Sequence, residues 1–309
     1  MHHDHHGHAH SPGQMKGVLR WAVVLTLALV AAEFLAGWLG GSIALVSDGV
    51  HNLTDLPTMV LAWLALLWAE RPPSEEKTYG YHRAGILAAF TNGILLVLVA
   101  LYLLYESYER LLAPVPVREG LMIWVSLLAL AINGGITLGL VRGRSDLNLR
   151  SILIHNFGDA LSNVAILLGA LAIRFWGITW IDPALGAAIG ALVLWSSIGI
   201  LRESSHILLE GTPRSLRVAD VAAAILGVPG VAEVHDVHVW TLGSDLHALS
   251  CHVSIPDMHM DESERILAAI NRALADCFHI GHSTIQFERA GLPRDSALYM
   301  PVPAATKPD

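Results

Sequence analysis

Charged residues are scarce in this sequence. Asp, Glu, Lys and Arg make up 15% of the 309 residues, whereas hydrophobic residues make up 53%. Soluble globular domains carry about 25% charged residues, so the composition departs from that of a soluble protein and indicates a membrane protein. Positive charge is scarcer still: the net charge is -8 and no basic stripe occurs, which argues against nucleic acid as a partner.

Cysteine is rare, and two well-known catalytic motifs are missing. The two cysteines, Cys251 and Cys277, form neither a disulfide framework nor a C-x-x-C zinc site, which is consistent with a reducing, cytosolic environment. No G-x-x-x-x-G-K-[ST] phosphate-binding loop occurs, so ATP is not the expected energy source. No H-E-x-x-H occurs, which argues against an intramembrane zinc enzyme.

Six long apolar segments occupy the first two thirds of the chain. They cover residues 18–40, 43–69, 84–106, 119–141, 151–174 and 178–201, each near or above the roughly 20 residues that a transmembrane helix needs. Lys and Arg concentrate on the side that holds both termini, so the positive-inside rule predicts cytoplasmic termini. The sequence therefore predicts an α-helical membrane domain with six transmembrane helices in residues 16–208.

The second apolar segment contains the stretch Ser47-Asp48-Gly49-Val50-His51-Asn52-Leu53-Thr54-Asp55. On a helix, Asp48, His51 and Asp55 stand at i, i+3 and i+7 and share one face. Burying ionisable side chains at this depth costs several kcal/mol, so they normally face a protein interior or a water-filled path and indicate function.

The spacing H-x-x-x-D occurs twice, as His51 with Asp55 and as His155 with Asp159, and Asn163 extends the second face by one turn. Two helices that each supply one nitrogen and one oxygen would complete a four-coordinate site of the kind that suits Zn²⁺. The alternative is two unrelated polar pairs that join helices by hydrogen bonds.

Other polar residues within the apolar segments allow two interpretations. Glu33, Asn92 and Asn133 either line an ion path or join helices by hydrogen bonds. Asp182, followed by Pro183, is typical of an N-cap at the start of the sixth helix.

Two polar stretches lie outside these segments. Residues 1–15 hold six of the seventeen histidines and indicate a disordered, metal-attracting tail, although an expression tag is an alternative. The loop over residues 70–83 carries Glu75, Glu76 and His82. It is either a solvated charged loop or a secondary metal site or electrostatic funnel.

Residues 209–290 have the pattern of a small cytoplasmic α+β domain, followed by a disordered tail over 291–309. A helical stripe near residues 218–226 precedes strands at 231–242 and 247–255, a second helix near 266–274 and a third strand at 283–289. His235 and His252 on neighbouring strands, with Glu288 on the third, are candidates for a cation site. Surface histidines without metal are the alternative.

Taken together, these motifs resemble the cation diffusion facilitator family, in particular its zinc-transporting bacterial branch. The resemblance extends from the first membrane helix to Glu288. It rests on both H-x-x-x-D motifs and on four further runs: Tyr79-Gly80-Tyr81-His82-Arg83-Ala84, Ile181-Asp182-Pro183, Leu209-Glu210-Gly211-Thr212-Pro213 and Val234-His235-Asp236-Val237-His238-Val239-Trp240.

The resemblance implies a proton-coupled antiporter of the bacterial inner membrane that exports Zn²⁺, with Cd²⁺ or Co²⁺ as further substrates. It implies that His51, Asp55, His155 and Asp159 form the transport site and that the protein is a homodimer. It also implies a metallochaperone-like, ferredoxin-like tail domain that binds regulatory zinc. Gln286 and Glu288 stand where members with two tail-domain metals have further histidines, which favours one cation. A passive channel and a sensor are the remaining alternatives.

Overall fold

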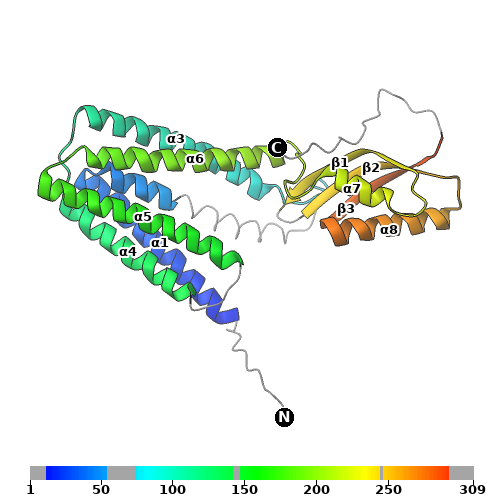
Figure 1. The fold of residues 1–309 in the computed structure, drawn as a ribbon, viewed down its shortest axis with the longest axis horizontal. Helices are drawn as coiled ribbons and strands as arrows, with labels where there is room; N and C mark the ends of the chain where they lie inside the picture. The colour runs from blue at the N-terminus through cyan, green and yellow to red at the C-terminus, as the bar shows by residue number, and fades with distance from the viewer. Residues whose placement is uncertain (1–11, 54–73, 142–146, 244–245, 292–309) are drawn as a thin grey trace, which may run out of the picture. The chain divides into compact units, whose positions relative to one another are not determined.

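The structure, a computed structural model, describes residues 12–53, 74–141, 147–243 and 246–291, and side chains within these ranges except for residues 12–23 and 136–156. The chain divides into two compact units, one drawn from residues 1–60 and 92–199 and the other from residues 61–91 and 200–309. Figure 1 shows the elements of both.

The first unit is a bundle of long helices. Its elements are α1 (Pro12–Gly40), a helix over residues 43–53, α4 (Glu119–Val141), α5 (Leu147–Trp176) and most of α3 (Ala84–Leu112) and α6 (Ile181–Leu208). These helices coincide with the six predicted apolar segments, of which the second is described only as far as residue 53. The predicted all-helical membrane domain is therefore confirmed for the described residues.

Apolar side chains cover the outside of this bundle. Trp195 is 82% exposed and Phe157 is 71% exposed, which is expected where a helix faces lipid. Among the described residues, α3, α6 and the Phe157–Trp176 part of α5 are long and apolar enough to cross a membrane, while Val24–Gly40 and Glu119–Gly135 are apolar but shorter.

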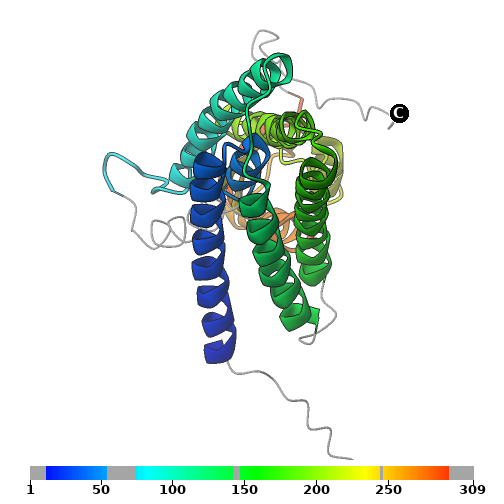
Figure 2. The same cartoon turned by 90° about the vertical axis from the view of Figure 1, so that its left-hand side faces the viewer.

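Small residues allow the helices of the bundle to approach closely. α4 packs against α1 and α5, as Figure 2 also shows. A side chain at Gly37 would place its Cβ 2.7 Å from Val46, and one at Gly169 would lie 2.6 Å from Leu185. Small residues at such contacts are typical of membrane helices, where close packing replaces the hydrophobic effect.

The second unit contains the predicted α+β domain. Its elements are α7 (Val218–Leu226), β1 (Glu233–Gly243), β2 (Leu246–Ile255), α8 (Met260–Phe278) and β3 (Ile280–Arg289). The sheet order is β1-β2-β3, with β1 antiparallel and β3 parallel to β2. The predicted order of helices and strands is confirmed, although β3 begins three residues earlier than expected.

Both helices of this domain cover the sheet through apolar stripes. Ile266, Ile270 and Leu274 recur every four residues along α8 and are buried, together with Val221 and Ile225 of α7. This spacing places them on one face of each helix, where they form a continuous core with the buried side of the strands. The opposite side of the sheet is left for polar residues.

Candidate functional site

The first candidate site lies where the helix over residues 43–53 meets α5. The His51 Nε2 atom lies 3.4 Å from Oδ1 of Asp159, and the Asp159 side chain is 8% exposed. The two residues come from different H-x-x-x-D motifs and are more than 100 residues apart in the sequence. The structure therefore brings the two motifs together.

A second contact between the same helices lies one turn away. The Ser162 hydroxyl donates a hydrogen bond of 2.6 Å to Oδ1 of Asp48, which is fully buried. Asp48 precedes His51 by three residues, whereas Ser162 follows Asp159 by three. Residue numbers therefore rise along one helix in the direction in which they fall along the other, so the two helices run antiparallel here.

Glu33 of α1 borders this site on another side. Both of its carboxylate oxygens accept hydrogen bonds of 2.9 Å from Nδ2 of Asn52, and Glu33 is fully buried. Gly49 makes the approach possible, since a Cβ at this position would lie 3.3 Å from the Cβ of Glu33. Of the two interpretations offered for Glu33, the structure shows the helix-to-helix hydrogen bond.

Two of the four predicted transport ligands are not part of this description. Asp55 lies outside the described residues, and His155 lies within α5 but its side chain is not described. Asn163 is buried and donates to the carbonyl oxygen of Asp159 at 2.8 Å, which ties it to its own helix. Asn133 is also buried, and Asn92 is half-buried.

Asp182 differs from its predicted role. α6 begins at Ile181, so Asp182 lies inside the first turn and is not the N-cap. Its carboxylate instead accepts hydrogen bonds from Ser42 and from the backbone N–H groups of Ile43 and Ala44, at the start of the helix over residues 43–53. The prediction of a structural capping role was right, but the prediction of which helix it caps was wrong.

The second candidate site lies on the sheet of the tail domain. His235 of β1 stands opposite His252 of β2, and their rings meet edge to face with centroids 5.4 Å apart. Glu288 of β3 reaches both imidazoles: Oε2 lies 3.2 Å from His235 Nε2 and Oε1 lies 3.0 Å from His252 Nδ1. Ligand atoms of all three residues lie within 4.8 Å of one another. The structure thus gathers the three residues that the sequence indicated.

This donor set fits a zinc ion. Two imidazole nitrogens and one carboxylate oxygen are ligands that Zn²⁺ prefers, and they leave one position for water or a further ligand. His235 is almost fully buried, whereas Glu288 and His252 are partly exposed, so a cation could reach the group from one side.

One residue beside this group was not among the predicted site residues. Asp236 Oδ2 lies 3.7 Å from His252 Nε2, and Oδ1 lies 3.1 Å from His238 Nε2. Its backbone has φ 53°, at the irregularity where β1 departs from its register with β2. The irregularity depends on the pairing of two strands, so the spacing of residues in the sequence did not reveal it.

The other histidines and the buried cysteine that the structure describes in the tail domain do not join the group of three. His238, His259, His279 and His282 are exposed, and His247 contacts Thr241. Cys251 belongs to β2, and burial of its side chain, with a smaller contribution from Asp236, raises the pKa of its thiol to about 12. Its side chain packs within the apolar core of the domain, so Cys251 is a core residue.

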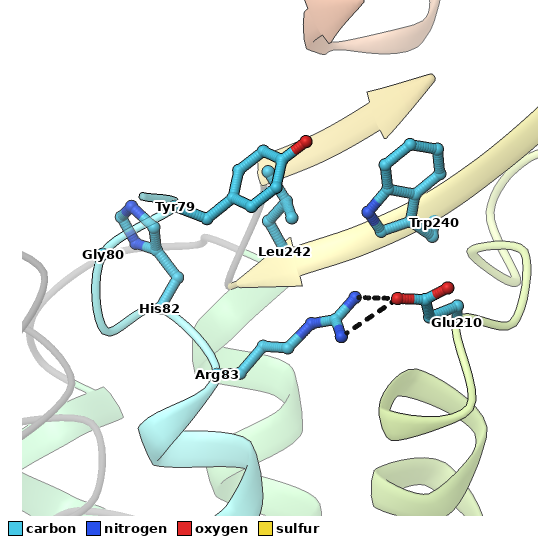
Figure 3. A pocket seen from close by; sticks show the side chains of 7 residues that line it. All are labelled: Tyr79, Gly80, His82, Arg83, Glu210, Trp240 and Leu242. Carbon is cyan, nitrogen blue, oxygen red and sulfur yellow. Dashed lines mark hydrogen bonds and ion pairs between the residues drawn. The ribbon is translucent and has the colours of Figure 1, made fainter. Parts of the chain in front are cut away.

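A cavity of about 370 Å³ lies elsewhere in the second unit (Figure 3). Tyr79, Trp240 and Leu242 line it together with Arg83, whose guanidinium contacts Oε1 of Glu210 at 3.3 Å. His82 also lines it, whereas Glu75 and Glu76 are exposed, as expected for a solvated charged loop. The described contacts assemble no metal site from these three loop residues.

Comparison with known proteins gives two family matches. Residues 19–209 match the family described as "Cation efflux transmembrane domain", and residues 213–290 match "Cation efflux protein, cytoplasmic domain". Together they span both units of the structure.

Several curated bacterial proteins are similar over almost the whole chain. A "Cadmium, cobalt and zinc/H(+)-K(+) antiporter" of Bacillus velezensis is 36% identical over 297 residues, which cover 95% of each chain. "Metal cation efflux system protein CzcD" of Cupriavidus metallidurans is 39% identical, covering 92% of this chain and 90% of that protein. "Zinc transporter ZitB" of Escherichia coli is 35% identical over 92% of both.

One solved structure resembles the tail domain in sequence. It is described as the metal-bound C-terminal domain of the CzcD transporter and is 40% identical. The match covers 24% of this chain and 99% of that domain, with a TM-score of 0.22.

Proposed function

Because the chain belongs to the cation efflux family, we propose that it exports Zn²⁺ from the cytoplasm in exchange for protons, with His51, Asp55, His155 and Asp159 as the transport site. Family members of this kind are transporters, which excludes the enzyme alternative. The observation that carries the proposal is the 3.4 Å contact between His51 and Asp159, which joins the two motifs inside the membrane domain.

The antiparallel pairing of the two helices supports the other two ligands. Asp55 follows His51 by four residues, and His155 precedes Asp159 by four. A helix that continued for one more turn beyond residue 53 would therefore bring Asp55 to the level of residue 155, because four residues forward on one antiparallel helix and four residues back on the other lead to the same side of the observed contact. Two nitrogen and two oxygen ligands then surround one ion, as a tetrahedral zinc site requires.

This ligand set also accounts for proton coupling. A histidine or carboxylate must lose its proton before it binds a metal, so protons and Zn²⁺ compete for the same side chains. Opening the site alternately to each side then carries zinc out and protons in. Two imidazoles favour Zn²⁺ over harder ions, while Co²⁺ and Cd²⁺ remain acceptable substrates, in keeping with the names of the relatives.

The tail domain supplies regulation in this proposal. His235, His252 and Glu288 would hold one zinc ion on the cytoplasmic side when its concentration is high. The protein would act as a homodimer in the bacterial inner membrane, with both termini cytoplasmic, and tail-domain zinc would draw the two protomers together. The grouping of three zinc-type ligands on adjacent strands supports this role.

Zinc uptake into inverted membrane vesicles tests the exchange mechanism. An antiporter accumulates Zn²⁺ inside such vesicles when their interior is acidic, and accumulation falls to the passive level when an ionophore collapses the pH gradient. Equal accumulation with and without the gradient would indicate a channel, and no zinc flux in either condition would indicate a sensor.

The transport site itself is tested by removing one ligand at a time. We expect His155→Ala and Asp159→Ala each to abolish transport, because the remaining ligands no longer complete the coordination of the ion. Phe157→Ala is the matched control, since this side chain lies between them on α5 but is exposed on the outside of the bundle. Transport at the normal rate by Asp159→Ala would refute the two-helix site.

A further inference from the structure

The first backbone N–H groups of the helix that carries His51 donate hydrogen bonds to side chains, and two of them donate to a side chain of another helix. An α-helix leaves its first four N–H groups without partners inside the helix. The N–H of Leu45 donates to Oγ of Ser42 at 3.2 Å, as expected for an N-cap residue. The two preceding groups, of Ile43 and Ala44, donate instead to the carboxylate of Asp182 at 2.9 and 3.3 Å.

The capping carboxylate comes from a distant helix. Asp182 lies in the first turn of α6, about 140 residues away from the helix that it caps, and is fully buried. The Ser42 hydroxyl also donates to it, at 2.5 Å. Asp182 thus stands at the N-terminal ends of two helices, where N–H groups without partners inside the helix and the helix dipoles favour a negative charge.

A glycine one turn along α6 makes this contact possible. A Cβ at Gly186 would lie 2.8 Å from the side chain of Ile43 and 3.2 Å from its carbonyl carbon. α6 therefore lies directly against the start of the capped helix, and a larger residue would push the carboxylate of Asp182 away from its donors.

From this geometry we propose that Asp182 is a positioning residue for metal transport, which fixes the rotation and depth of the helix over residues 43–53. His51 follows Ile43 by eight residues, about 12 Å along the axis, so a rotation at the capped end also turns the imidazole away from Asp159. The inference rests on the proposed transport site. It assigns a role in transport to Asp182, which is not among the four residues proposed to bind the ion.

The neighbouring contacts do not replace this cap. Arg110 donates to the carbonyl oxygen of Gly41, and the Arg118 N–H donates to that of Gly40. Both bonds fix carbonyl groups of the turn before the helix, and neither provides an acceptor for the N–H groups at its start. At the far end Asn52 is held by Glu33. Loss of Asp182 therefore leaves the turn at Gly40 and Gly41 in place, while the N–H groups of Ile43 and Ala44 lose their acceptor. We expect the variant to fold with His51 displaced.

The test compares zinc KM with maximal flux for the full-length protein in proteoliposomes. We expect Asp182→Ala to raise the KM about 2- to 30-fold, the range that corresponds to loss of a cap. A residue needed only for folding would lower the number of active molecules, and therefore the maximal flux, without changing the KM. An unchanged KM in Asp182→Ala would overturn the proposal. If Asp182→Ala does not accumulate, Asp182→Asn keeps the shape and one acceptor oxygen, and the same criterion applies to it.

A charge relocation provides the decisive comparison. The double variant Asp182→Ala with Ser42→Asp returns a carboxylate to the same helix end from its own N-cap, in the space that the first substitution vacates. We expect it to recover most of the lost affinity, and failure to recover at equal protein levels would contradict the positioning role. Asp159→Ala is measured alongside: normal transport by that variant would refute the transport site, whereas normal KM in Asp182→Ala alone would refute only this inference.

Discussion

Removing the imidazole of His252 provides a quantitative test of the tail-domain zinc site. In the fragment 211–309, the proposed site offers an ion three ligands, and His252→Ala leaves only His235 and Glu288. Zinc at about 100 times its Kd stabilises a folded domain by about 2.7 kcal/mol. For a domain of this size each kcal/mol shifts the melting temperature by about 4–8 °C, so zinc should raise it by roughly 10–20 °C.

The variant should lose most of this effect. If losing one of three ligands weakens binding on the order of 100-fold, the same zinc concentration adds only about 0.4 kcal/mol, a shift of about 2–3 °C. The melting temperature without zinc should change little, because His252 is partly exposed and is not part of the apolar core.

Thermal unfolding with and without zinc, together with calorimetric titration, measures both quantities. His282→Ala is the matched control, because it removes an exposed histidine from the same sheet but outside the group of three ligands. It should show the full zinc-induced shift. An equal shift in His252→Ala would remove this residue from the site and refute the three-ligand assignment.

Four further predictions concern other parts of the chain. Deleting residues 2–10 should change the apparent zinc affinity modestly and leave turnover intact, because no intramembrane ligand is lost; abolished flux in a well-expressed deletion would contradict this. His51→Asp should admit Cd²⁺ or Mn²⁺ relative to Zn²⁺ in competitive flux, because a harder oxygen replaces a nitrogen; an unchanged ratio would place selectivity elsewhere. Alkylation near neutral pH should label exposed Cys277 and spare Cys251. Since the Cys251 pKa rises from 9.0 to about 12 on folding, the stability that its protonated thiol contributes is complete below about pH 9 and is lost as the pH rises towards 12.

The two candidate sites make different demands on the protein. A transport site must release its ion, and the proposed one lies between two helices, where His51 meets Asp159. The tail-domain group sits on three paired strands, which hold its ligands in a fixed register. Ligands held in a fixed register suit a sensor of zinc concentration, so the proposal places regulatory binding and transport in separate structural units.

The sequence by itself determined the helices and indicated the types of ligand. Long apolar runs predict membrane helices, and they indicate that His51 and His155 within them are too costly to bury without a function. The alternating pattern of the last hundred residues likewise determined the order of helices and strands. These features depend on residues within a few turns of one another, so local spacing contains them.

Only the tertiary structure decided which of these residues meet. It paired His51 with Asp159, gave Glu33 to Asn52, placed Asp236 beside His252, and showed that Asp182 caps a helix about 140 residues earlier in the chain. Each of these contacts depends on how two helices or strands are set against each other, through close approach at glycines or through strand register. Local spacing carries no such information, because the same motif on an isolated helix is compatible with many partners.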